Sequence, residues 1–128
     1  FERLAMKSID PLLDRQHDRE NYHCVHFVIE AGKYLFGYDF TDNFLGLANP
    51  LDSNGHPSRH TVKNSDKTQI PIDGTVVLMT KLDNRLHVGL YYAGRVLHLS
   101  KSGVRYQSIR QLQREYKRLR FYNAKNFH

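Results

Sequence analysis

The chain has 128 residues, of which 40% are hydrophobic and 25% are charged, values typical of a soluble globular protein. This length predicts a single domain over residues 1–128 with one core, and no apolar run approaches the length of a transmembrane helix. The single cysteine excludes an internal disulfide and a thiolate-rich zinc site, while the net charge of +6 favours an anionic partner.

A short helix is predicted near the N-terminus, within residues 8–17. Asp10-Pro11 combines a helix N-cap with proline at the first helical position. Leu12 and Leu13 are expected to pack this helix on the core. The polar residues 18–21 that follow are expected to form a loop.

The strongest helix prediction is Cys24–Phe36. Apolar side chains repeat there at three- and four-residue steps, and Gly37 stands where a glycine ends many helices. Cys24 opens this helix on its apolar side, where free backbone N–H groups favour a thiolate. The alternative is that Cys24 is a small buried hydrophobic residue, as most free cysteines are.

The segment from Tyr38 to Gln69 is predicted to be irregular, with turns at Asn49-Pro50, Asn54-Gly55 and His56-Pro57. His56 and His60 lie four residues apart in it. No acidic or thiolate cluster near them completes a zinc site, so we expect neither a metal nor another cofactor.

The C-terminal half is predicted to form a mostly antiparallel sheet, which makes the chain an α+β protein. Basic residues are densest over Arg110–Arg120, where helical spacing gives an apolar side at Leu112, Tyr116 and Leu119, and a basic helix is expected there before the last strand. No nucleic-acid-binding motif accompanies its charges, so we read them as a solvated face. The expected strands are Thr75–Thr80, Leu86–Tyr92, Arg95–Ser100, Val104–Gln107 and Leu119–Tyr122.

Two histidines are predicted to meet on one face of the second and third strands. His87 and Gly89 share a face, because side chains alternate along a strand. If Ala93-Gly94 forms a two-residue turn, Gly89 lies opposite His98, which is then diagonal to His87 at about 7–8 Å. The alternative is a pair of half-exposed surface imidazoles.

Together these residues suit nucleophilic catalysis. Cys24 would attack a carbonyl carbon, and His87 would pair with its thiolate and then protonate the leaving amine. His98 would bind the other nitrogen of His87 and hold its tautomer. Backbone N–H groups at the start of the helix would stabilise the oxyanion.

Four stretches resemble the NlpC/P60 cysteine peptidases, namely Tyr22-His23-Cys24, Asp73–Leu78, His87–Tyr91 and Val96–Ser100. The resemblance implies a papain-like α+β fold, with N-terminal helices packed on a mostly antiparallel sheet of about five strands. It also implies a Cys24–His87–His98 triad, with Tyr22 and His23 near the oxyanion site. The implied substrate is a peptidoglycan stem peptide, typically cut at a γ-D-glutamyl bond to a diamino acid.

Within this superfamily, Gly103–Tyr106 and the late Arg120–Tyr122 look most like bacteriophage tail-associated members. That likeness implies a virion-tail, secreted or periplasmic location, with tail proteins or a larger parent chain as further partners. The chain begins at Phe1 rather than methionine, and we expect it to be part of a longer protein.

The chain also departs from the family. Members usually carry Asp before the cysteine and small residues after it, whereas His23 precedes Cys24 and Val25-His26 follow. His23 would add positive charge beside the thiolate or tune the site to another amide or ester. The alternatives are a thiol amidase or acyltransferase with a non-wall substrate, or a non-catalytic tail-assembly module. The loop 49–69 is expected to wall the cleft.

Overall fold

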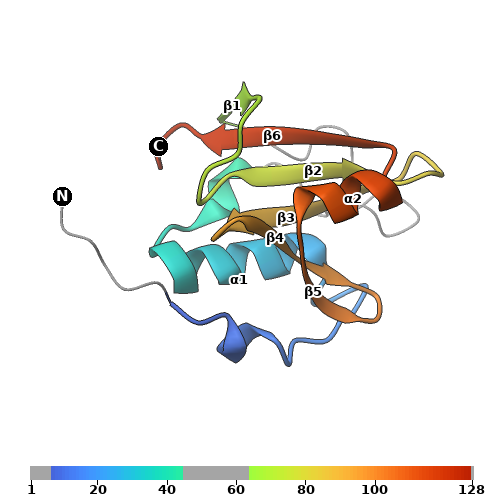
Figure 1. The fold of residues 1–128 in the computed structure, drawn as a ribbon. Coiled ribbons are helices and arrows are strands. Elements are labelled where there is room, and N and C mark those ends of the chain that lie inside the picture. Colours follow the sequence, from blue (N-terminus) through green and yellow to red (C-terminus); the bar gives the residue numbers. More distant parts are fainter. Residues whose placement is uncertain (1–6, 45–63, 128) are drawn as a thin grey trace.

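The computed structural model describes residues 7–44 and 64–127, which form an α+β structure (Figure 1). Its strands make one antiparallel sheet in the order β1-β6-β2-β3-β4-β5, so the described part has six strands where about five were predicted. The elements are η1 (Asp10–Leu12), α1 (Cys24–Phe36), η2 (Phe40–Asn43), β1 (Ser65–Thr68), β2 (Val76–Thr80), β3 (Leu86–Tyr92), β4 (Arg95–Ser100), β5 (Gly103–Gln107), α2 (Ile109–Glu115) and β6 (Arg118–Ala124).

The two faces of the sheet carry different helices. Val76 and Leu78 of β2 point into the larger core, which they share with the buried side of α1. Val77 and Met79, which alternate with them, pack on the other face against Leu112 of α2. Figure 1 shows α1 lying along β3 and β4, the strands that it contacts.

Helix α1 has the predicted bounds. Gly37 follows it in the left-handed conformation, with φ of 66°, and its N–H returns to the carbonyl oxygen of Lys33. The buried side of the helix includes Cys24, Phe27 and Val28, as the spacing predicted. The start of this helix is thereby held against the sheet.

The predicted hairpin is confirmed. Ala93 and Gly94 both have positive φ, 52° and 86°, as a two-residue hairpin turn requires. The turn pairs Leu90 with Leu97, so side-chain parity continues across it as expected. The ladder has three residue pairs, although β3 has seven residues and β4 has six. His87 of β3 and His98 of β4 therefore lie beyond the end of this ladder, while each still pairs with its other neighbour, His87 with Met79 of β2 and His98 with Arg105 of β5.

The predicted strand at Leu119–Tyr122 is confirmed within β6, but the helical spacing assigned to Tyr116 and Leu119 is wrong. Helix α2 ends at Glu115, and Tyr116 has the extended backbone of its C-cap. The backbone N–H of Lys117 then binds the carbonyl oxygen of Thr80, and β6 runs between β1 and β2. Pairing with two strands outweighs the helical spacing of Leu119, because it satisfies backbone groups on both sides.

The N-terminal prediction also needs correction. The short helix is a single 3-10 turn in which Asp10 is the first helical residue, while Ile9 occupies the N-cap position. Leu12 is buried, but Leu13 is 47% exposed. A turn this short presents one side to the core, so only one of the two leucines packs there.

Part of the predicted irregular segment is regular, since η2 and β1 both lie within 38–69. The three predicted turns at 49–57, along with His56 and His60, fall outside the described residues, as does most of the loop 49–69. Among the described residues, no helix is long and apolar enough to cross a membrane.

Candidate active site

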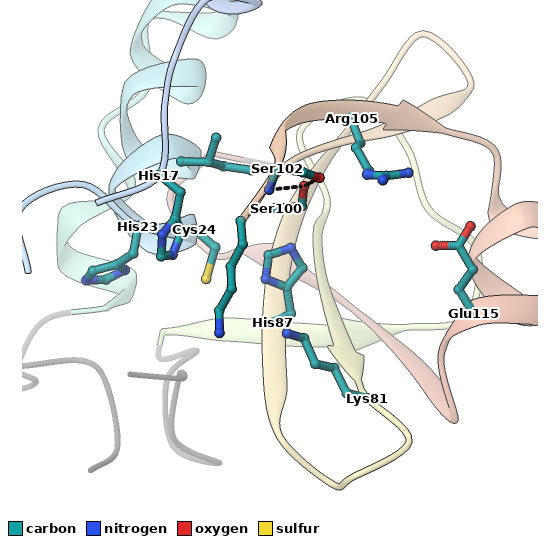
Figure 2. Close-up of a pocket in the computed structure, with 11 residues that line it drawn as sticks. His17, His23, Cys24, Lys81, His87, Ser100, Ser102, Arg105 and Glu115 are labelled. Atoms are coloured by element: carbon teal, nitrogen blue, oxygen red, sulfur yellow. Dashed lines mark hydrogen bonds between the residues drawn. The ribbon is translucent and has the colours of Figure 1, made fainter. Parts of the chain in front are cut away.

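One pocket brings the predicted nucleophile and base together. Cys24 enters it from the first turn of α1 and His87 enters from β3, so two distant stretches of sequence meet there (Figure 2). The pocket has a volume of about 330 Å³. Its lining residues are His17, His23, Cys24, Lys81, His87, Leu99, Ser100, Lys101, Ser102, Arg105 and Glu115.

Two histidines cap the helix that carries Cys24. The Nδ1 atom of His23 accepts from the backbone N–H of Val25 at 3.4 Å, and Nδ1 of His26 accepts from the N–H of His23 at 3.1 Å. This is a reciprocal capping box made by imidazoles. It explains how the helix starts without the aspartate that is usual in the resembled family.

His23 does not supply the predicted positive charge. It is 2% exposed, and burial lowers its pKa to about 4, with His26 the next contributor. A neutral imidazole is therefore the stable form near pH 7, because burial penalises the charged form. The cap leaves Nε2 of the neutral ring protonated, so His23 is a hydrogen-bond donor on the pocket wall.

Cys24 is a buried thiol rather than a preformed thiolate. It is 4% exposed, and burial raises its pKa to about 11. Backbone N–H groups of Val88, Val25 and Cys24 itself, together with the charge of Lys81, oppose that rise. The expected helix N-terminal N–H groups therefore do act on the sulfur, but desolvation outweighs them.

His87 and His98 form the predicted pair. Nε2 of His87 lies 2.9 Å from Nδ1 of His98, with ring centroids 5.0 Å apart and nearly perpendicular planes. Both side chains are buried, at 6% and 1% exposed, so the alternative of half-exposed surface imidazoles is wrong. The ring of Tyr116 stacks on His87 at 6.2 Å, with an interplanar angle of 5°.

The hydrogen-bonded row continues beyond the two histidines to residues that the sequence did not single out. Nε2 of His98 lies 2.8 Å from Oε1 of Gln107, whose Nε2 donates to Glu115 at 2.9 Å. Gln107 is 8% exposed at the end of β5, and Glu115 is the last residue of α2. The row therefore runs from the pocket wall to a carboxylate on the helix.

Positive side chains dominate the charged wall of the pocket. Lys81, Lys101 and Arg105 line it, and Glu115 is the one carboxylate among its described lining residues. Burial, and then the charge of Lys101, lower the pKa of Lys81. The sequence showed excess positive charge but not its convergence on the wall of this pocket.

Tyr22 is turned toward a different group. Its hydroxyl donates to the carboxylate of Glu30, which also accepts two parallel hydrogen bonds from Arg15 at 3.0 and 2.6 Å. Tyr22 is not one of the described pocket-lining residues, whereas His23 is. In this structure Tyr22 therefore braces the turn before Cys24.

Within 7–44 and 64–127, no three His, Cys, Asp or Glu side chains cluster as a metal site would require. Comparison with known proteins adds no assignment to this geometry. No protein-family model matches the chain, and no curated protein matches it.

Proposed function

We propose that this protein is a cysteine peptidase or amidase that uses Cys24, His87 and His98. The observation that carries the proposal is the pocket that Cys24 and His87 both line, with His87 bonded behind it to the buried His98 at 2.9 Å. A nucleophile, a base and a group that orients the base are the three parts that such catalysis requires.

His87 acts as the base through its Nδ1 atom, because Nε2 is bonded to His98. Nδ1 takes the thiol proton as Sγ of Cys24 attacks the carbonyl carbon. The tetrahedral intermediate collapses when the same proton passes to the leaving amine, which leaves a thioester. Water then attacks the thioester with His87 again as base, which releases the acid and restores the thiol.

The raised pKa of Cys24 sets the order of these events. With a pKa of about 11 from burial, the unassisted thiolate amounts to on the order of one part in ten thousand at pH 7. Proton transfer to His87 therefore accompanies substrate binding or attack. The substrate carbonyl would displace water from the sulfur, and the thiolate would form only as the sulfur attacks it.

The oxyanion is stabilised by donors at the start of α1. The backbone N–H of Cys24 already acts on the sulfur, and the protonated Nε2 of His23 belongs to the same wall. Two such donors are what a tetrahedral oxyanion needs. Tyr22 contributes by bracing this turn through Glu30.

The proposed substrate is a peptidoglycan stem peptide, and its support is the NlpC/P60 resemblance in residues 22–24, 73–78, 87–91 and 96–100. The papain-like fold, the single domain over 1–128 and the virion-tail, secreted or periplasmic location are proposed on the same ground. The positively charged pocket wall is compatible with the carboxylates of such peptides.

Incubation of the protein with purified peptidoglycan tests this proposal. We expect wild type to release soluble peptides with new amino termini, and Cys24→Ala to release none. Lys67→Met is the control variant. It changes an exposed residue of the edge strand β1 and should remain active. Equal release by wild type and Cys24→Ala, or no release by either, would contradict the proposal.

The burial of Cys24 also supports a second candidate, a non-catalytic tail or wall-binding module. Burial raises the pKa of the Cys24 thiol to about 11, and a raised thiol pKa is typical of an inert cysteine in a protein core. Peptidoglycan cosedimentation separates the two candidates. Binding by wild type and Cys24→Ala alike, without released peptides, would favour the module.

A further inference from the structure

The row of hydrogen bonds behind His87 has a single chemically consistent direction. It joins His87 on β3, His98 on β4, Gln107 on β5 and Glu115 on α2, with separations of 2.9, 2.8 and 2.9 Å. The three members nearest the pocket are at least nine-tenths buried. Buried imidazole and amide groups bind in one orientation only if a neighbour dictates it.

The direction starts at Glu115. A carboxylate accepts hydrogen bonds and does not donate them, so the amide nitrogen of Gln107 must face it. The amide oxygen of Gln107 then faces His98 and accepts in turn. Without Glu115, the amide could turn over and present its nitrogen to His98 instead.

The orientation of the Gln107 amide determines which nitrogen carries the proton in His98 and then in His87. Because the oxygen of Gln107 only accepts, the proton of His98 sits on Nε2. Burial lowers the pKa of His98, which keeps the ring neutral and its Nδ1 an acceptor. Nε2 of His87 must then be the donor in the bond to His98.

This leaves Nδ1 of His87 as the atom that gains and loses a proton. We propose that Glu115, acting through Gln107 and His98, fixes the tautomer of His87 and thereby keeps Nδ1 available as the base. Glu115 and Gln107 are positioning residues, because neither touches the reacting atoms. The inference rests on the proposed role of His87 in catalysis.

A purely structural role for the same contacts is the competing explanation, since Gln107 and Glu115 also tie α2 to β5. The structure provides other anchors for that helix. Leu112 is fully buried against the sheet, and Ser108 with Gln111 forms a capping box at the helix start. Loss of the Gln107–Glu115 bond should therefore change tautomers more than stability.

Substitutions at 115 separate these explanations. Glu115→Gln offers both an acceptor and a donor, so it permits the wild-type direction without dictating it and should lower kcat by less than about tenfold. Glu115→Lys offers only donors, so the amide of Gln107 turns over and both imidazole tautomers invert. We expect kcat to fall by about 100-fold or more, with KM nearly unchanged, because Nδ1 of His87 then carries its proton already.

Two further variants complete the design. Asp66→Lys on β1 makes the same change in net charge far from the row and should behave as wild type. The double variant Gln107→Glu/Glu115→Lys places a carboxylate opposite His98 and a cation beside it. This variant should recover most of the lost kcat, which a structural role does not predict.

The direct readout is the nitrogen-15 NMR spectrum of the histidine rings, which reports the protonated nitrogen of each ring. We expect Nε2-protonated rings for His87 and His98 in wild type, a mixture of tautomers in Glu115→Gln, and Nδ1-protonated rings in Glu115→Lys. Unchanged tautomers in Glu115→Lys would overturn the inference. Since this measurement needs no turnover, it stands apart from any failure of the peptidoglycan assay.

Discussion

Gly89 separates the two histidines of the site, and a side chain in its place would crowd His98. A Cβ built on Gly89 would lie 3.0 Å from Cβ of His98 and 2.7 Å from Cγ1 of Val96. Contacts this short force the neighbouring strand to move. The glycine is therefore what lets β4 approach closely enough for the bond from His87 to His98.

The first prediction is that Gly89→Ala widens the gap between the two imidazoles. We expect the protein to fold with a loss of about 1–3 kcal/mol in the free energy of unfolding, as overpacked sites show. Activity should fall at least tenfold, because the tautomer of His87 is no longer held. Urea unfolding and peptide-release rates measure the two effects.

Gly94→Ala is the comparison for this experiment, since a Cβ there meets no atom within 4 Å, although φ of 86° makes that substitution strained. It should lower stability without lowering activity per folded molecule. Equal activity losses in both variants would show that the close approach at Gly89 is unimportant.

The second prediction concerns Lys81, whose charge lowers the pKa of Cys24 against the larger effect of burial. Lys81→Met should raise the thiol pKa further and slow alkylation by iodoacetamide at pH 8–9, where the reactive thiolate is scarce. Thiolate absorbance and alkylation rates across pH give the measurement. Lys67→Met removes the same charge from β1 and should leave the titration of Cys24 where it was.

The parts of the site that the sequence predicted depend on local rules. Side-chain alternation and one two-residue turn are enough to bring His87 and His98 together, since β3 and β4 are consecutive in the chain. The same side-chain alternation could have predicted that Gln107 lies next to His98. His98 pairs with Arg105, so Gln107 lies diagonal to His98, as His98 does to His87.

Other parts depend on packing between distant segments. The meeting of Cys24 with His87 requires α1 to lie on β3 and β4, which no spacing within either stretch specifies. Glu115 joins the row from the last turn of α2, so its place depends on how that helix packs against the end of β5. The thiol pKa depends on burial in the folded state, so the helix-start argument alone predicted its direction wrongly.

The third prediction separates the capping role of His23 from its charge. His23→Ala removes the acceptor for the N–H of Val25 and should cost about 1 kcal/mol of stability, as lost N-caps do. His23→Asp keeps an acceptor but places a negative charge beside the sulfur. It should therefore retain stability while raising the pKa of Cys24 and slowing alkylation.

Chemical denaturation and the pH dependence of alkylation measure these two effects of His23. Ser108→Ala removes the corresponding cap of α2 and is a control for capping away from the thiol. A lowered thiol pKa in His23→Asp would contradict the assignment of His23 as a neutral cap.

The last prediction concerns the pH dependence of stability at the turn before Cys24. The hydrogen bonds from Arg15, followed by that from Tyr22, hold the pKa of Glu30 below its ordinary value against the effect of burial. A carboxyl whose folded pKa is depressed stabilises the protein above its unfolded pKa, and this contribution is lost as pH falls through the folded value. Since both side chains are about one-third exposed, the contribution should not exceed about 1 kcal/mol.

Glu30→Gln should therefore unfold more easily than wild type at pH 7, and the difference should shrink toward pH 3. Urea unfolding at a series of pH values gives this comparison directly. Asp14→Asn removes the other carboxylate that pairs with Arg15. The Asp14 side chain is 81% exposed, so this pair should contribute much less to stability. If the wild type and Glu30→Gln differ equally at pH 7 and pH 3, the charge of Glu30 does not stabilise this turn.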